Sequence, residues 1–279
     1  MTPDMPQERV TWSGSLHQTF RLVPEPSKNL KPFLEADGLT PDELLRLLPY
    51  DRARAGGSER ELPDPKRYRD GKQVYETIGL LYEDEGGRVR VTRLGAATRR
   101  FMNVINAPNA VILGRHAAYA LAACQLRNPT GAGKKYDASM RVFPFAFIWR
   151  AMLALEGKLS SEELNRALMR VRDETDLARA IGLIRDSRVS GAPEAMGERV
   201  VETEPIEDRI IPWISMASFG WTLIQDKKGQ DGTFYTIRPN AFEVVREASR
   251  IHHKHREFGS TAEYSEHVAR WAGLPEDLR

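Results

Sequence analysis

The stretch GLLYEDEGGRVRVTRLG, residues 79–95, decides the fold that the sequence predicts. Gly79–Glu83 and Arg88–Thr92 are short runs of apolar, aromatic and β-branched residues, which favour β-strands. The acidic, glycine-rich tripeptide Glu85–Gly87 lies between them and favours a tight turn. This stretch therefore predicts a β-hairpin.

A second hairpin is predicted further along the chain. Trp221–Gln225 and Thr233–Arg238 favour strands, and the glycine-rich segment Gly229–Gly232 favours the turn between them. In both copies a helical pattern precedes the hairpin and another follows it. The first copy covers residues 73–104 and the second covers residues 208–248.

A helix beside a hairpin is the arrangement of a winged helix, a small helix-turn-helix domain whose usual partner is duplex DNA. We therefore expect a mainly α fold with small β-hairpins, organised as tandem winged-helix (helix-turn-helix) domains with a helical linker. The expected parts are an N-terminal arm plus the first winged-helix domain at residues 1–127, a linker at 128–140, the second winged-helix domain at 141–257 and a C-terminal docking helix at 258–279.

Helix signals lie on both sides of the first hairpin. Thr40 is a suitable helix cap, because a proline and two acidic residues follow it. Residues 51–72 combine Arg, Gly, Pro and Asp, which favour a mobile basic loop. Residues 103–125 are rich in alanine and other apolar residues, so a buried connecting helix is expected there. Prolines disfavour a continuous helix in the first forty residues, and we expect an arm packed on the domain.

Helical spacing continues in the second half of the sequence. Phe145–Leu155 has one apolar face, and Gly157 ends this helix. Ser160 caps another helix over residues 164–171. Further helices are expected over residues 173–184, 209–219 and 241–256, and a docking helix is expected from the spacing of Tyr264, Val268, Trp271 and Leu274.

The composition is that of an ordinary globular protein, with 279 residues of which 41% are hydrophobic and 29% are charged. No uncharged apolar run approaches the roughly 18 residues that span a bilayer. Residues 1–20 carry no secretory signal and Cys124 is the one cysteine, so we expect a cytoplasmic location and no membrane contact. The formal net charge is only +2, so affinity for nucleic acid depends on where the charges lie.

Basic residues cluster around the first hairpin. Four precede it within residues 66–72, and five arginines follow within the hairpin and the next helix. Alternating Arg and Val is also typical of any half-buried strand, but this density on one small domain suits phosphate contact. The residues predicted to contact DNA are Lys66, Arg67, Arg69, Lys72, Arg88, Arg90, Arg93, Arg99, Arg100, Lys134, Lys135, Arg209, Lys227, Lys228 and Arg238.

The residues around both hairpins resemble the DNA-recognition region of type IIS restriction endonucleases. There a short strand ends in Gly-Leu-Ile and a wing ends in Thr-x-x-Gly, and Gly79–Tyr82 and Thr92–Gly95 are similar to these. Arg141–Arg150 with Leu155–Leu164 resembles the start of the second winged domain. In that family the winged domains read DNA and a separate domain cuts it. The resemblance thus implies a non-catalytic DNA-recognition subunit of a bacterial restriction or anti-phage defence system, with nuclease or ATPase activity in a partner subunit.

Two other functions stay open. The chain could be a metal-dependent PD-(D/E)xK-like nuclease, in which Asp42 or Asp64 pairs with Asp70-Gly71-Lys72, although chance matches of so short a pattern are common. It could also be a winged-helix protein–protein adaptor in a multi-subunit complex. The apolar patch of such an adaptor would include Trp213, Phe219 and Trp221.

Other chemical motifs are weak. Gly131–Lys135 is similar to the end of a phosphate-binding loop, but Asn128 and Lys135 stand where that pattern requires Gly and Ser or Thr. His252 and His255 have the spacing of a metal-binding pair without a second ligand cluster nearby. We therefore expect no catalytic residue, no metal site, no cofactor and no enzymatic activity in this chain.

Overall fold

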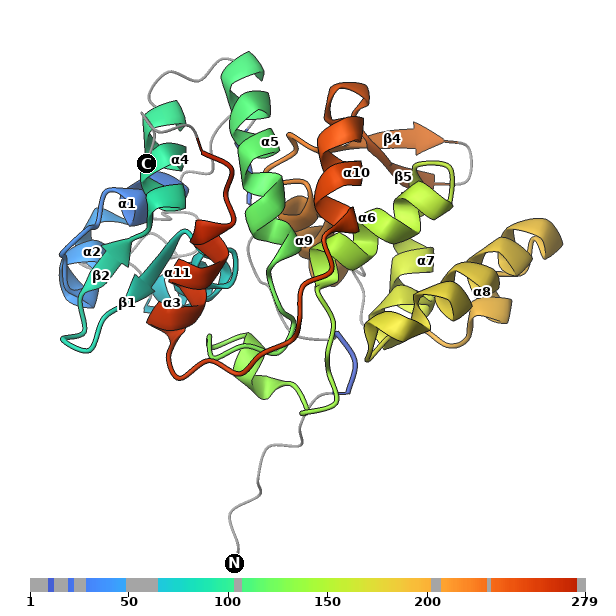
Figure 1. Ribbon diagram of the computed structural model, residues 1–279, viewed down its shortest axis with the longest axis horizontal. Coiled ribbons are helices and arrows are strands. Elements are labelled where there is room, and N and C mark those ends of the chain that lie inside the picture. Colours follow the sequence, from blue (N-terminus) through green and yellow to red (C-terminus); the bar gives the residue numbers. More distant parts are fainter. Residues whose placement is uncertain are drawn as a thin grey trace, which may run out of the picture.

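Helices form most of the structure, and two small antiparallel sheets lie among them (Figure 1). The structure is a computed structural model and describes residues 10–12, 20–22, 29–48, 65–102, 107–201, 207–229 and 232–274. Buried apolar side chains from both halves of the sequence join into one hydrophobic core. The predicted mainly α fold with small β-hairpins is confirmed.

The first unit contains the first hairpin and the helices around it. Its elements are α1 (Leu30–Leu34), α2 (Pro41–Leu47), α3 (Pro65–Thr77), β1 (Leu81–Glu83), β2 (Val89–Val91) and α4 (Arg93–Met102). A short segment between α1 and α2 extends the hairpin: the Gly38 N–H donates to Val89 O (2.7 Å), and the Val89 N–H donates to Leu39 O (2.9 Å). The order is therefore helix, extended segment, two helices and hairpin.

The residues that carry the sequence resemblance hold the first hairpin in place. Gly79 has φ +71°, and a Cβ there would lie 2.7 Å from Cγ1 of Val268. A Cβ on Gly95 would lie 2.1 Å from Leu80 O. The Thr92 hydroxyl donates to Gly79 O (2.6 Å) and accepts from the Gly95 N–H (3.2 Å). Close packing therefore requires glycine at both positions, and Thr92 links them.

The second unit repeats this order with an additional helix. Its elements are α6 (Pro144–Ala154), β3 (Lys158–Ser160), α7 (Ser161–Arg166), α8 (Leu177–Ser190), α9 (Glu207–Ala217), β4 (Ile224–Gly229), β5 (Gly232–Ile237) and α10 (Phe242–Arg250). The sheet order is β3-β5-β4, with Lys158 opposite Thr236 and Ile224 opposite Ile237. β3 thus pairs with the last hairpin strand, as the segment between α1 and α2 does in the first unit. The structure also contains short 3-10 helices: η2 (Gly133–Lys135), η3 (Leu168–Arg170), η4 (Glu174–Asp176), η5 (Pro193–Met196) and η6 (Pro239–Ala241).

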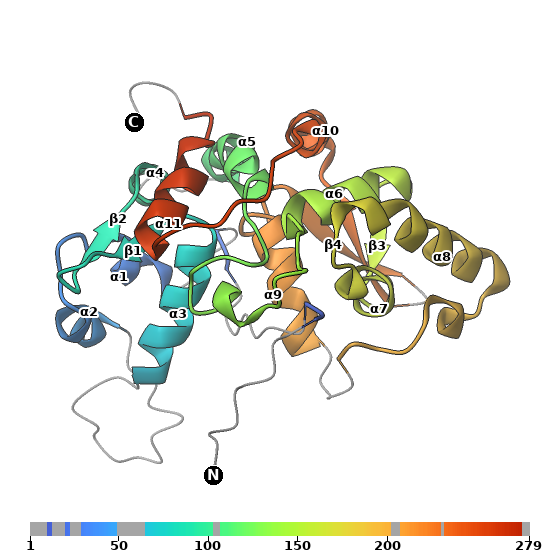
Figure 2. The same cartoon turned by 60° about the horizontal axis from the view of Figure 1, so that its bottom comes forward.

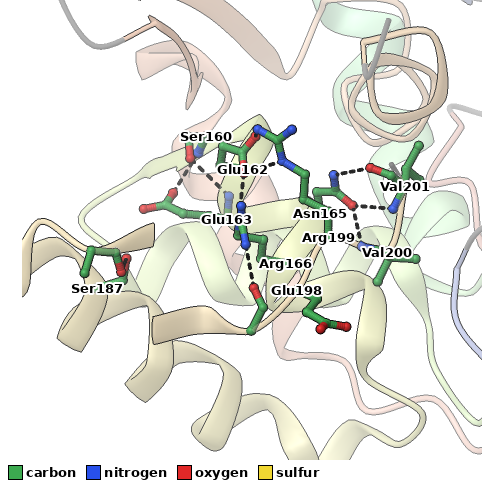
Figure 3. Close-up of polar contacts among 12 residues, drawn as sticks. Ser160, Glu162, Glu163, Asn165, Arg166, Ser187, Glu198, Arg199, Val200 and Val201 are labelled. Atoms are coloured by element: carbon green, nitrogen blue, oxygen red, sulfur yellow. Dashed lines mark hydrogen bonds and ion pairs between the residues drawn. The ribbon is translucent and has the colours of Figure 1, made fainter. Parts of the chain in front are cut away.

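Polar contacts connect α7 to the segment that leads towards α9 (Figure 3). Glu162 accepts hydrogen bonds from Arg166 Nε (2.8 Å) and Arg199 Nη2 (2.6 Å). The Asn165 side chain is fully buried and accepts from the backbone N–H groups of residues 200–201 (3.0 and 2.9 Å). A buried amide needs such partners, so these bonds fix the segment on α7.

The two ends of the described chain each pack against the unit at the other end of the sequence. Trp12 near the N-terminus belongs to the second unit, where its Nε1 donates to Val171 O (2.8 Å). The helix α11 (Thr261–Arg270) packs against α3 and β1 of the first unit, where the Tyr264 hydroxyl donates to Thr77 O (3.0 Å). The helix α5 (Ala107–Ala122) packs against both α4 and α10 (Figure 1). Each chain end thus completes the unit that is more distant in sequence.

Local signals located several elements correctly. Thr40 and Ser160 each form a capping box, with Glu43 and Glu163 respectively, at the starts of α2 and α7. β1, β2 and β5 begin and end within two residues of their predicted strands, whereas β4 begins three residues and ends four residues later than predicted. The connecting helix is present as α5.

Several predicted boundaries were wrong. α7 ends at Arg166 and α8 ends at Ser190, where ends at residues 171 and 184 were expected. α3 begins at Pro65, inside the expected loop, because burial of Val74 and Tyr75 outweighs the low helix preference of the residues before them. α10 ends at Arg250, and residues 251–258 are not helical. Gln125 binds the backbone of this segment, since its side chain donates to Arg256 O (2.8 Å) and accepts from the Arg256 N–H (3.0 Å).

Candidate nucleic-acid interface

The helix α3 exposes a charged N-terminal half and buries its C-terminal half. Lys66 and Arg69 are exposed and Lys72 is partly exposed, whereas Val74 and Tyr75 are buried. In Figure 2 the N-terminal end of α3 points away from α4, α5 and α11. These basic residues were expected on a loop before the helix, and the structure corrects this by placing them on the helix itself.

The ammonium group of Lys72 lies among acidic groups at the junction of α3 and β1. It forms an ion pair with Glu83, and its Nζ lies 3.8 Å from Oε1 of Glu76. The Tyr68 hydroxyl donates to the same Glu83 carboxylate (3.2 Å). Burial raises the pKa of Glu76 to about 7, while the nearby charge of Lys72 acts in the opposite direction. Lys72 therefore stabilises this junction, and its charge is largely neutralised.

The arginines of the hairpin order its turn. Arg88 Nη1 donates to Gly38 O (2.7 Å), and Arg90 Nε donates to Asp84 Oδ2 (2.7 Å). Asp84 also accepts from the backbone N–H groups of Gly86 (3.0 Å) and Arg88 (2.9 Å), and the bond from Arg88 contributes most to lowering the pKa of Asp84. The Arg90 guanidinium therefore helps to hold the turn through Asp84, whereas the Arg88 guanidinium joins the hairpin to the segment between α1 and α2.

The arginines of α4 differ in role. Arg93 was predicted to contact DNA, but its guanidinium donates to Ala269 O (3.0 Å) and to Arg270 O at the end of α11. It therefore holds the C-terminus of a helix, where cations are favoured. Arg99 is partly exposed and Arg100 is exposed in the last turn of α4.

Two lysines of the predicted linker lie near α3. Lys134 and Lys135 are exposed in η2, and the charge of Lys134 acts on the carboxyl group of Glu76. The segment before them is packed against α3, because Thr130 and Thr77 share a hydrogen bond between their hydroxyls (3.2 Å). The structure thus places Lys134 near the C-terminal half of α3, where Lys72 and Glu76 lie, and no sequence spacing indicated this.

The second unit offers fewer exposed cations. Arg209 is exposed in the first turn of α9, but the described side chains that follow it on α9 are buried or half-buried. Lys227 and Lys228 are exposed on β4. Arg238 is partly buried and its Nε donates to Trp221 O (2.8 Å), so it supports the hairpin. The side chain of Arg67 lies outside the described residues.

The apolar patch predicted for a protein adaptor is not on the surface. Trp213 and Phe219 are buried, with 3% and 0% of their surface exposed, and Trp221 is half-buried. The structure therefore corrects this prediction: Trp213 and Phe219 belong to the hydrophobic core, and Trp221 packs against it.

The residues considered for metal chemistry are dispersed. Asp70 lies on α3 beside Arg69 (3.7 Å), and Asp42 lies in the first turn of α2, while Asp64 is outside the described residues. His252 and His255 follow the end of α10, so they do not share a helix face. Among the described residues, no group of three His, Cys, Asp or Glu side chains is placed to hold a metal ion.

Sequence reasoning missed the acidic members of the α3 junction, Glu76 and Glu83. A helix begun at Pro65 would have revealed Tyr68, Lys72 and Glu76 as one face, because residues four apart lie together on a helix. In the part of the chain that the structure describes, none of the helices has the length and apolar character needed to cross a membrane.

Comparison with models of known protein families and with curated protein sequences finds no match. Among solved structures, the chain is similar to the binding domain of the BpuJ1 endonuclease, determined in complex with pyrene- and phenanthrene-modified DNA. The TM-score is 0.55 at 11% sequence identity, and the match covers 92% of this chain and 96% of that chain. At this identity the likeness concerns the fold alone. The chain thus has a fold similar to that of an endonuclease binding domain over almost its whole length.

Proposed function

We propose that this protein binds duplex DNA through two winged-helix units. The observation that carries the proposal is the first unit, in which the exposed, basic N-terminal half of α3 lies beside the β1–β2 hairpin. A winged helix presents the N-terminal residues of one helix to the major groove and its hairpin to the adjacent backbone. The fold shared with a binding domain that was solved on DNA supports this function.

The two units have different roles in this proposal. Arg69 and Lys66 on α3 approach base edges or phosphates, and Arg88 and Arg90 on the hairpin contact neighbouring phosphates. In the second unit α9 occupies the position of α3, but it is buried beyond Arg209. The second unit therefore contributes backbone contacts, through Arg209, Lys227 and Lys228.

We also propose that the chain recognises DNA without cutting it, as part of a restriction-type or anti-phage system whose nuclease or ATPase is a separate subunit. This step is supported by the likeness to the binding domain of an endonuclease.

The test is fluorescence anisotropy of a labelled duplex with the full chain at several salt concentrations. Binding should weaken steeply with salt, because each phosphate contact releases about 0.9 of a counterion. Arg69→Ala should lower the slope of log affinity against log salt by about 1. The matched control is Arg179→Ala on α8, since both arginines are exposed beside an aspartate.

Absence of binding at low salt would overturn the DNA function. Equal losses in Arg69→Ala and Arg179→Ala would overturn the assignment of α3. The same duplex, incubated with magnesium and examined by electrophoresis, should stay intact, and cleavage would contradict the non-catalytic role.

A further inference from the structure

A groove between α6 and α10 lies outside the surface proposed for DNA. Its volume is about 500 Å³, which falls within the range of small-molecule sites. Leu153 and Ala154 from α6 line it together with Phe242, Arg246 and Arg250 from α10. In Figure 2 α10 lies on the opposite side of the molecule from the N-terminal end of α3. A duplex held by α3 would therefore leave the groove free.

Arg150 holds the wall of the groove in place, and its charge is paired within the chain. Its guanidinium forms an ion pair with Glu174 and donates to Ser249 O (2.6 Å) and Ile251 O (3.2 Å). The bonds to Ser249 and Ile251 join α6 to the end of α10, and the ion pair joins α6 to η4. Arg150 therefore holds the two walls of the groove, α6 and α10, together.

Two arginines of α10 retain unused hydrogen-bonding capacity. Arg246 pairs with Glu243 through Nη2, but its Nε is buried and has no hydrogen-bond partner among the described residues. Arg250 is exposed, and the described residues give it no ion pair or side-chain hydrogen bond. The buried Nε is closed to a ligand, so the donors that the groove offers are the exposed guanidinium of Arg250 and the exposed part of the Arg246 side chain, which is 41% exposed.

The same groove contains an exposed aromatic ring. Phe242 is 39% exposed at the start of α10, and Leu153 is partly exposed opposite it. An aromatic ring can stack on a planar base, and guanidinium groups bind phosphate. A ligand that joins a planar ring to an anion would therefore use both. An inorganic anion would leave the Phe242 ring in contact with water.

We propose that the groove binds a nucleoside phosphate. The phosphate accepts hydrogen bonds from Arg250 and Arg246, whose planar guanidinium groups match phosphate oxygens. The base stacks on Phe242 and packs against Leu153. This site is independent of the proposed DNA function, since it uses other residues on another side of the molecule.

The test is a fluorescence titration of the full chain with a methylanthraniloyl derivative of AMP. The wild-type chain should show saturable binding, and unlabelled AMP should compete. Arg250→Ala and Phe242→Ala should each weaken binding by about tenfold or more, because a charge-assisted hydrogen bond or a stacked base is worth about 1 to 3 kcal/mol. Both side chains are exposed, so circular dichroism should report an unchanged fold.

Arg179→Ala on α8 is the matched control and should bind the probe as the wild type does, because it removes an exposed arginine outside the groove. Arg250→Lys should retain part of the affinity. No saturation up to about 1 mM probe would overturn the proposal. Competition by inorganic phosphate equal to that by AMP would overturn the assignment of a nucleoside. The two proposals are tested separately. A chain that binds AMP but no DNA would overturn only the DNA function, and a chain that binds DNA but no AMP would overturn only the nucleotide site.

Discussion

The Nζ atom of Lys72 lies 3.8 Å from Oε1 of Glu76 and also forms an ion pair with Glu83. The Lys72 ammonium thus interacts with two carboxylates. Glu76 is almost fully buried, with 4% of its side chain exposed. Because Lys72 lies on α3 and Glu83 on β1, this cluster connects the proposed reading helix to the hairpin. Its charges therefore affect stability as well as the orientation of α3.

Lys72→Ala should lower the free energy of unfolding by about 1 to 3 kcal/mol, since it leaves a buried carboxylate without its cation. Urea denaturation at neutral pH measures this loss. In a Glu76→Gln background the same substitution should cost less, because the buried charge is gone. An equal cost in both backgrounds would show that the two side chains do not interact energetically.

Glu76→Gln should change how stability depends on pH. Burial raises the pKa of Glu76 from 4.5 to about 7, so between these values the folded chain binds a proton that the unfolded chain does not. The stabilisation is complete below pH 4.5 and is lost as pH rises through 7, a change of about 3 kcal/mol.

The measurement is the free energy of unfolding of both proteins from pH 4.5 to 8. Glu76→Gln should gain stability relative to the wild type as pH rises. Burial lowers the pKa of His253 to about 4, which acts in the opposite direction, but this contribution is present in both proteins and cancels in the difference. A difference that is constant with pH would contradict the assignment to Glu76.

Arg93→Ala should loosen α11 without removing a DNA contact. The guanidinium of Arg93 donates to Ala269 O and Arg270 O, so its loss leaves the end of α11 without these donors. We expect a destabilisation of about 1 to 3 kcal/mol and faster amide hydrogen exchange in residues 261–270. The salt slope of DNA binding should stay that of the wild type, and a fall by about 1 would instead indicate a phosphate contact.

Gly79→Ala should destabilise the first unit by more than about 1 kcal/mol. The added Cβ meets Val268 Cγ1 at 2.7 Å, and the φ of +71° is unfavourable for alanine. Thermal unfolding measures the effect. Gly87→Ala is a useful comparison, because φ is +72° there but no atom lies within 4 Å of the added Cβ. Equal losses at both positions would mean that backbone strain alone, and not contact with α11, explains the cost.

Features with local causes were predictable from the sequence. The glycine-rich turns located both hairpins, and Thr40 and Ser160 located two helix starts through bonds within three residues. The composition of residues 107–122 was sufficient to predict a buried helix.

Features with distant causes were not predictable in this way. Arg93 has the same local setting as a DNA-facing arginine, but its acceptors are 176 and 177 residues away in the sequence. The start of α3 depends on what covers Val74 and Tyr75, which no neighbouring residue reveals. Trp213 and Phe219 were candidates for a surface patch because their spacing does not distinguish a core from an interface.

The packing of each chain end against the more distant unit has a consequence for the order in which the protein is made. The ribosome synthesises the first unit early, but α11, which covers α3 and β1, is translated only after β5 and α10. The first unit therefore waits, with part of its apolar surface uncovered, until the second is nearly complete. Trp12, in contrast, emerges long before its neighbours Val171 and Trp213 exist. The native packing of each unit thus needs residues from the opposite end of the described chain.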